Sequence, residues 1–160
     1  MPAAPATWTA RITDPSGISA DVNPEGYQFA PGRAVTLRDG QDVTLIATGA
    51  VVARALAAAE QLAGDGVSAR VLSLPTVKPL DQDAVLDAAR ETAGIVTVEE
   101  ALTSGLGGAV AELVAREHPT RMRYVGVPDE FAPTGSVEWL LDHFGISLDG
   151  IASAARELLG

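Results

Sequence analysis

Short apolar runs alternate with longer stretches of helix-forming residues from about Ala34 to the C-terminus. Val43–Thr48 is almost entirely apolar or β-branched, which is typical of a strand buried on both faces of a sheet. Val51–Ala63 is rich in alanine and predicts a helix, which Gly64 and Gly66 end. The same alternation predicts strands over 69–74, 95–98 and 122–127, and helices over 82–92, 109–117, 137–144 and 148–159.

Strands and helices that alternate at this spacing predict right-handed crossovers and a parallel sheet with helices on both faces. One further short strand, Val35–Arg38, is joined to Val43–Thr48 by only Asp39–Asp42. Because so short a connection favours antiparallel neighbours, we expect these two strands to pair. The predicted fold is therefore a three-layer α/β/α domain with a five-stranded, mostly parallel sheet and one antiparallel edge strand.

The first 33 residues differ from the remainder of the chain. Five prolines and three glycines interrupt them, which is typical of a linker. Trp8–Thr13 is the one stretch here that predicts an extended strand. We therefore expect residues 1–33 to form an arm with one strand and residues 34–160 to form the globular domain.

Composition and charge exclude several classes of function. The chain contains no cysteine, which removes thiol nucleophiles and cysteine-ligated metals. Its 21 acidic residues against 11 basic ones give a net charge of −10, which opposes binding to the phosphates of nucleic acids. No apolar stretch approaches the ~20 residues that span a bilayer, and no secretory signal is visible. We expect a cytoplasmic protein that binds neither nucleic acid nor membrane.

Few residues offer catalytic chemistry. His118 and His143 fall at predicted helix ends, where a histidine favours the helix dipole, and neither has an acid or histidine at metal-ligand spacing. Glu99 and Glu100 follow a strand at its carboxyl end, the edge where open α/β sheets place ligands. A structural alternative is that this pair contacts the neighbouring helix N-terminus or a partner subunit.

Two glycine-containing turns are candidate anion sites. Gly105 and Gly107 lie in a Gly-Leu-Gly-Gly run at a predicted helix start, and Thr48 and Gly49 follow the central strand. Neither turn has the spacing of a dinucleotide fingerprint or a phosphate-binding loop, and close packing of a helix on the sheet explains small residues equally well. We therefore predict no catalytic, cofactor-binding or metal-ligating residue, and keep these six positions as possible anion or interface positions.

Several motifs together resemble the C-terminal domain of the transketolase family. Asp42–Gly49 resembles the family's "DVTLIATGS", and Pro75–Asp81 resembles its "P-x-x-KPLD". Val98–Glu100 with Gly105–Glu112 resembles "VEE…GGLGGAVAE", and Gly126–Phe131 resembles "GVPD-x-F". The resemblance covers about residues 27–159. The chain departs from it at Ala101, where many relatives have a histidine.

The resemblance implies a non-catalytic role in a dimeric thiamine-diphosphate enzyme. Gly64–Gly66 reads Gly-Asp-Gly, but this run ends a predicted helix and no asparagine follows it, so it lacks the pattern that holds Mg²⁺ and pyrophosphate. The resemblance implies that separate subunits with the pyrophosphate and pyrimidine domains bind thiamine diphosphate and Mg²⁺. The expected function is that of a small subunit of a split transketolase, inactive alone and needed for assembly of the ketol-transferring complex.

Other functions stay open on the sequence alone. The chain could be a regulatory module that binds a small anion, a fragment of a longer protein, or a domain of the type found in 2-oxoacid dehydrogenase beta subunits or deoxyxylulose-phosphate synthase. If it is a subunit, we expect its partner surface to include Val51, Val52 and Ala55. The arm around Trp8, Arg11 and Ile12 would then add a strand to the partner's sheet.

Overall fold

The computed structural model describes residues 22–160, and the predicted arm strand with Trp8, Arg11 and Ile12 lies outside this range. Five strands form one sheet in the described part: β1 (Val35–Arg38), β2 (Val43–Ala47), β3 (Ala69–Ser73), β4 (Ile95–Leu102) and β5 (Met122–Val127). The helices are η1 (Gly49–Val51), α1 (Val52–Gly64), α2 (Gln82–Glu91), α3 (Leu106–Glu117), α4 (Val137–His143) and α5 (Leu148–Leu159). None of the helices in residues 22–160 has the length and apolar character needed to cross a membrane.

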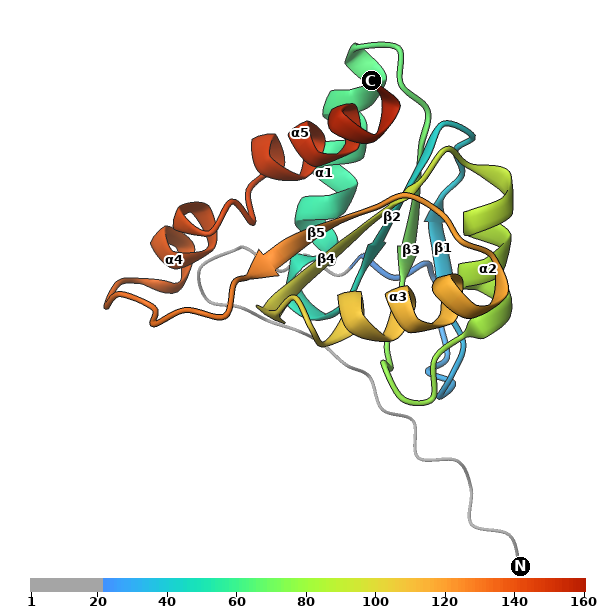
Figure 1. Ribbon diagram of the computed structural model, residues 1–160, viewed down its shortest axis with the longest axis horizontal. Helices are drawn as coiled ribbons and strands as arrows, with labels where there is room; N and C mark the ends of the chain where they lie inside the picture. The colour runs from blue at the N-terminus through green and yellow to red at the C-terminus, as the bar shows by residue number, and fades with distance from the viewer. Residues whose placement is uncertain (1–21) are drawn as a thin grey trace, which may run out of the picture.

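The predicted fold class is confirmed. The strand order is β1-β3-β2-β4-β5, with β1 antiparallel to β3 and all other neighbours parallel (Figure 1). All five residues of β2 are buried, as its apolar sequence predicts for a central strand.

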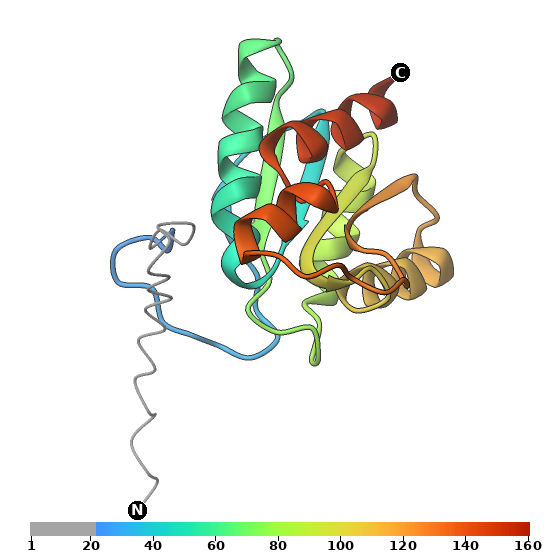
Figure 2. The same cartoon turned by 90° about the vertical axis from the view of Figure 1, so that its left-hand side faces the viewer.

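Helices cover both faces of the sheet. α1 and α5 lie side by side on one face, over a core that includes Leu45, Val71 and Val96 (Figure 2). α2 and α3 cover the other face, over a core that includes Ile46 and Ile95. Alternate residues of each strand thus face opposite layers, as the two-residue period of a strand requires.

The predicted pairing of β1 with β2 is wrong. β3 lies between them, and β1 pairs with β3 at Val35–Ser73 and Thr36–Leu72. The connection crosses the start of β3, where the N–H groups of Gln41 and Asp42 both donate to the carbonyl of Ser68. Strands lie about 4.8 Å apart, so four linking residues have enough reach to pass over one strand.

Two other boundaries differ from the prediction near Glu99. β4 continues past Val98 to Leu102, with a shift of register against β5, and α3 begins at Leu106 rather than Ala109. Both extensions flank the same buried carboxylate, whose contacts are described below.

The loop that carries the "KPLD" motif joins β3 to α2 and is hydrogen-bonded to the segment before β1. The Asp81 carboxylate accepts from the N–H of Ala84 at 3.2 Å, so it is the N-cap that the sequence predicts, and from the N–H of Ala34 at 2.7 Å. Thr76 Oγ1 accepts from the N–H of Gly32 and donates to the carbonyl of Pro79. Pro79 and Asp81 of the motif therefore have structural roles.

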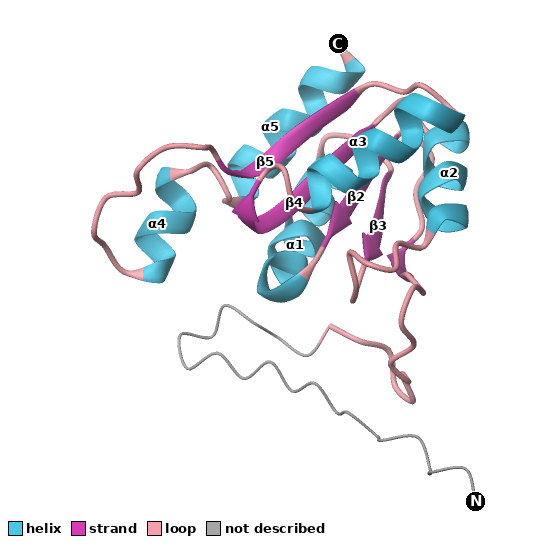
Figure 3. Ribbon diagram, turned by 60° about the horizontal axis from the view of Figure 1, so that its bottom comes forward, coloured by secondary structure: helices cyan, strands magenta, loops and turns pink. Residues whose placement is uncertain are grey.

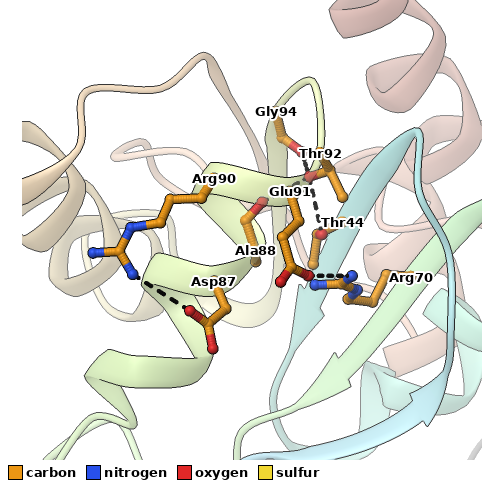
Figure 4. Close-up of polar contacts among 8 residues, drawn as sticks. All are labelled: Thr44, Arg70, Asp87, Ala88, Arg90, Glu91, Thr92 and Gly94. Carbon is orange, nitrogen blue, oxygen red and sulfur yellow. Dashed lines mark hydrogen bonds and ion pairs between the residues drawn. The ribbon is translucent and has the colours of Figure 1, made fainter.

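The other end of α2 is fastened to the sheet by Thr92 (Figure 4). Its hydroxyl lies 3.1 Å from the hydroxyl of Thr44 on β2 and 2.9 Å from the carbonyl of Ala88. Beside it, Arg70 on β3 pairs with Glu91 at 2.7 Å. These contacts hold the end of α2 against the start of β2 and β3.

Candidate functional site

The carboxyl edge of the sheet has a topological switch point between β2 and β4. From β2 the chain crosses to β3 on one side, whereas β4 lies on the other side. Open α/β sheets bind ligands at such points, because the loops that leave the two strands diverge there. The turn at Thr48–Gly49 and the end of β4 at Glu99 are the two walls of this position.

Glu99 is almost fully buried, with 3% of its surface exposed. One carboxylate oxygen accepts from the N–H of Leu106 at 2.8 Å, and the other accepts from the N–H of Gly107 at 2.9 Å. These N–H groups belong to the first turn of α3, where backbone N–H groups have no hydrogen-bond acceptor within the helix. The carboxylate thus satisfies two buried donors and lies at the positive end of the helix dipole.

The glycines of the Gly-Leu-Gly-Gly run have different structural roles. A Cβ at Gly105 would lie 2.5 Å from Glu99 Oε2, and a Cβ at Gly107 would lie 2.6 Å from the ring of Tyr124. Nothing lies within 4 Å of a Cβ at Gly108. The first two glycines therefore let the carboxylate and β5 approach α3, and the third does not serve close packing within the domain.

The geometry brings together three of the six candidate positions. Glu99, Gly105 and Gly107 form one cluster. In it the Glu99 carboxylate occupies the N-terminus of α3, the place that the sequence offers to an external anion. Glu100 is the next residue on β4, and it is exposed to solvent. Charge from a second anion in this cluster would face Glu99 directly, which is unfavourable.

Thr48 and Gly49 lie at the start of η1, where the N–H of Thr48 donates to the carbonyl of Val98, the residue before Glu99, at 3.3 Å. The Thr48 hydroxyl donates to the carbonyl of Leu74 at 2.7 Å instead of capping the helix. Gly49 has φ +70°, a left-handed conformation that glycine adopts without strain. Neither η1 nor α1 has a side-chain cap or an acidic residue in its first turn.

Residues that the sequence did not single out complete the Glu99 cluster. A Cβ at Gly126 on β5 would lie 3.0 Å from the carbonyl oxygen of Ala101 and 3.2 Å from Glu99 Cγ, so glycine lets β5 pass close to the carboxylate stem. Thr97 is buried on the same face of β4, and its hydroxyl has no hydrogen-bond partner among the described residues. Gly126 was visible only as part of the "GVPD" motif, and Thr97 gave no signal in the sequence.

The two histidines occupy the helix ends that the sequence predicts. His118 is the C-terminal cap of α3, and His143 is the last residue of α4, where its ring stacks on Trp139 with centroids 4.8 Å apart. Within residues 22–160, no three histidine, aspartate or glutamate side chains are grouped as ligands for a metal ion.

The surface predicted on α1 is wrong. Val51, Val52 and Ala55 are buried in the core. The alanine-rich sequence of this helix lets α5 pack closely against it, so the domain itself covers the face that we expected a partner to cover.

The fold is an α/β domain in which the carboxylate of Glu99 caps the start of α3 at the carboxyl end of β4. The family model described as "Transketolase, C-terminal domain" matches residues 32–151. The chain therefore belongs to the transketolase C-terminal domain family, whose enzymes depend on thiamine diphosphate.

Two relatives are named as subunits, which implies that each works with further chains. The chain is 45% identical over 138 residues to 6-deoxy-6-sulfo-D-fructose transketolase subunit SqwH of Clostridium sp. (strain MSTE9), covering 86% of this chain and 43% of that protein. It is 39% identical over 136 residues to a subunit of the apulose-4-phosphate transketolase of Phocaeicola vulgatus, covering 84% and 43% respectively.

Two further relatives extend the comparison. The chain is 40% identical over 145 residues to 1-deoxy-D-xylulose-5-phosphate synthase of Heliobacterium modesticaldum, covering 89% of this chain and 22% of that enzyme. A solved structure described as "Split gene transketolase, inactive beta4 tetramer" superimposes with a TM-score of 0.84 at 36% identity, covering 88% of this chain and 46% of the other. The chain thus spans less than half the length of these four relatives.

The carboxylate nearest the switch point is already engaged within the domain. Glu99 is the buried carboxylate nearest the switch point, and both its oxygens already accept backbone N–H groups. A Mg²⁺ ion or a thiamine ring at this position would compete with the hydrogen bonds that hold the start of α3.

Proposed function

We propose that the chain is the non-catalytic C-terminal-domain part of a split, thiamine-diphosphate-dependent transketolase-like enzyme. In this proposal it is needed for assembly of the ketol-transferring complex and is inactive alone. Partner subunits with the pyrophosphate and pyrimidine domains bind thiamine diphosphate and Mg²⁺, and the assembled complex is dimeric. Residues 34–160 are the globular domain in this arrangement, and residues 1–33 are the arm.

The proposal is carried by the similarity to a transketolase subunit, taken together with the structural role of Glu99. The chain is 45% identical to a transketolase subunit over 86% of its length. Its one buried strand-end glutamate, Glu99, is committed to holding α3. A domain with the family's fold and a sequestered carboxylate suits assembly better than chemistry.

Reconstitution tests this function. The source organism's transketolase chains that carry the thiamine-diphosphate-binding domains are purified with and without this chain, and ketol transfer between sugar phosphates is measured. We expect transfer only when the chain is present, and none from the chain alone. Full turnover by the other chains without it would contradict the proposal.

The likeness to 1-deoxy-D-xylulose-5-phosphate synthase supports a second assembly. In that case the same mixture would condense pyruvate with glyceraldehyde 3-phosphate and would not transfer a ketol group. Assaying both reactions on one preparation decides between the two enzymes, because each reaction forms a different product.

A regulatory function has one observation in its favour. The N-terminus of η1 at Thr48–Gly49 has no side-chain cap, whereas the starts of α2, α4 and α5 are capped by Asp81, Ser136 and Ser147. If the isolated chain binds a small anion there, calorimetry with phosphosugars and nucleotides will give a heat of binding. A Gly49→Ala variant should lose it, because alanine is strained at this φ.

A further inference from the structure

The segment that follows β5 projects from the body of the domain. It consists of the loop 128–136 and α4, and we refer to residues 128–143 as the projecting loop–helix (Figure 3). Every residue from 128 to 139 is exposed. Its far end is anchored by Leu141, which is buried in the core, and by the pair between Arg54 and Asp142 at 2.7 Å.

Large apolar side chains lie on this exposed segment. Phe131 is fully exposed, and Val137 and Trp139 are about half exposed. Leu102, the exposed last residue of β4, pairs with Val127 where the segment leaves the sheet. Apolar groups gathered on one projecting segment mark an association surface, because water contact with them is unfavourable.

The charged residues of the projecting loop–helix are all acidic. Residues 124–155 contain no lysine or arginine, whereas Asp129, Glu130, Glu138 and Asp142 all lie in the projecting loop–helix. Beside α4 is an open hollow of about 460 Å³ between α1, α4 and α5, and three carboxylates line it: Glu138, Asp142 and Asp149. Arg54, the one cation in its lining, is engaged by Asp142 and by the carbonyl of Ile146.

We infer that the projecting loop–helix is the docking surface for a second protein that presents an apolar patch flanked by lysine or arginine, one of which enters the acidic hollow. A second copy of this chain would bring the same acidic surface against itself, which is unfavourable. The inference rests on the proposed function for the partner's identity, which is the chain that carries the thiamine-diphosphate-binding domains. The matched relatives have more than half of their length outside this domain.

Site-specific photo-cross-linking in the source organism tests this inference where the complex forms. Benzoylphenylalanine replaces Phe131 in the full chain, and the matched control replaces Phe29, which is exposed in the segment before β1. After irradiation, the cross-linked proteins are identified by mass spectrometry. We expect position 131 to capture a transketolase-family chain with the thiamine-binding domains, and position 29 to capture far less of it.

Each other result overturns the inference. Capture of a second copy of this chain would show a self-association surface, and capture of an unrelated protein would show a different partner. Equal capture at both positions, or none at position 131, would show that this surface is not a docking site. The readout does not use catalysis, so a failure of ketol transfer with specific capture at position 131 would remove the proposed activity and leave the docking surface.

Variants then measure the contribution of each part of the surface to binding between the full chain and the captured partner. Phe131→Ser should weaken binding by about 10-fold or more, as loss of a buried aromatic anchor does, and Phe29→Ser should not. Glu138→Lys should weaken binding and reduce its dependence on salt, whereas Glu112→Lys, at an exposed position of α3, should do neither. Because Phe131 and Glu138 are exposed, unchanged circular dichroism is expected, and unchanged affinity in both variants would contradict the inference.

Discussion

At the scale of single residues, Glu99 shows how a strand-end acid can have a structural role. Its carboxylate accepts from two buried N–H groups at the start of α3. Glu99→Ala removes both acceptors, and each buried donor left unsatisfied costs about 1 to 3 kcal/mol. We expect the free energy of unfolding to fall by about 3 kcal/mol in urea denaturation, with loss of helix at the α3 N-terminus.

The adjacent acid provides the matched control. Glu100 is exposed, and Glu100→Ala should change the free energy of unfolding by less than about 0.5 kcal/mol. Glu99→Gln should fall between the two, because its amide oxygen can accept from one N–H while its amide N–H₂ opposes the other. If Glu99→Ala and Glu100→Ala were equally stable, the capping role of Glu99 would be wrong.

At the scale of elements, Gly40 lets the connection from β1 to β2 pass close over the start of β3. It lies in the connection from β1 to β2, where a Cβ would collide with the backbone of Ala69 and Arg70 at the start of β3. Gly40→Ala should lower the free energy of unfolding by about 2 kcal/mol, because backbone cannot move aside as a side chain can. The measurement is chemical denaturation followed by far-ultraviolet circular dichroism.

Gly108→Ala is the control for the element scale. Gly108 lies in α3 with nothing within 4 Å of the added Cβ, so alanine should raise stability by up to about 1 kcal/mol through its better helix propensity. A destabilising Gly108→Ala would show that the helix start tolerates no side chain at all, and would remove the contrast with Gly40.

At the scale of the whole molecule, Arg54 joins the projecting loop–helix to the body. It is 9% exposed, and its guanidinium donates to Asp142 and to the carbonyl of Ile146, which link α1 to α4 and to the turn before α5. Arg54→Met should lower the free energy of unfolding by about 1 to 3 kcal/mol, because the Ile146 carbonyl loses a charged donor. The substitution should also increase the rate of amide hydrogen exchange more in α4 than in α1.

Arg116→Met is the matched control, because Arg116 is exposed on α3 and pairs only with the exposed Glu117 and Glu112 among the described residues. Exposed ion pairs contribute less than about 1 kcal/mol, so stability should change little and exchange in α4 should not change. Equal effects of the two substitutions would show that Arg54 does not orient α4.

Most of the fold could be predicted from sequence because its signals are local. The buried run Val43–Thr48, the alanine-rich helix after it and the cap at Asp81 each depend on residues within a few positions of one another. The pairing of β1 with β3 could not be predicted, because Ser68 and Asp42 meet only when the sheet forms. The start of α3 depended in the same way on a carboxylate seven residues earlier in the chain.

The sequence by itself determined the class of fold, the family motifs and the acidic, cysteine-free composition, because periodicity and residue type are properties of the chain alone. Tertiary structure decided three things: that Val51, Val52 and Ala55 are buried in the core, that Glu99 faces inward to cap α3, and that Phe131 stays in solvent. An apolar residue has the same identity in a core and on a surface. Only the packing of distant elements determines whether water or another side chain surrounds it.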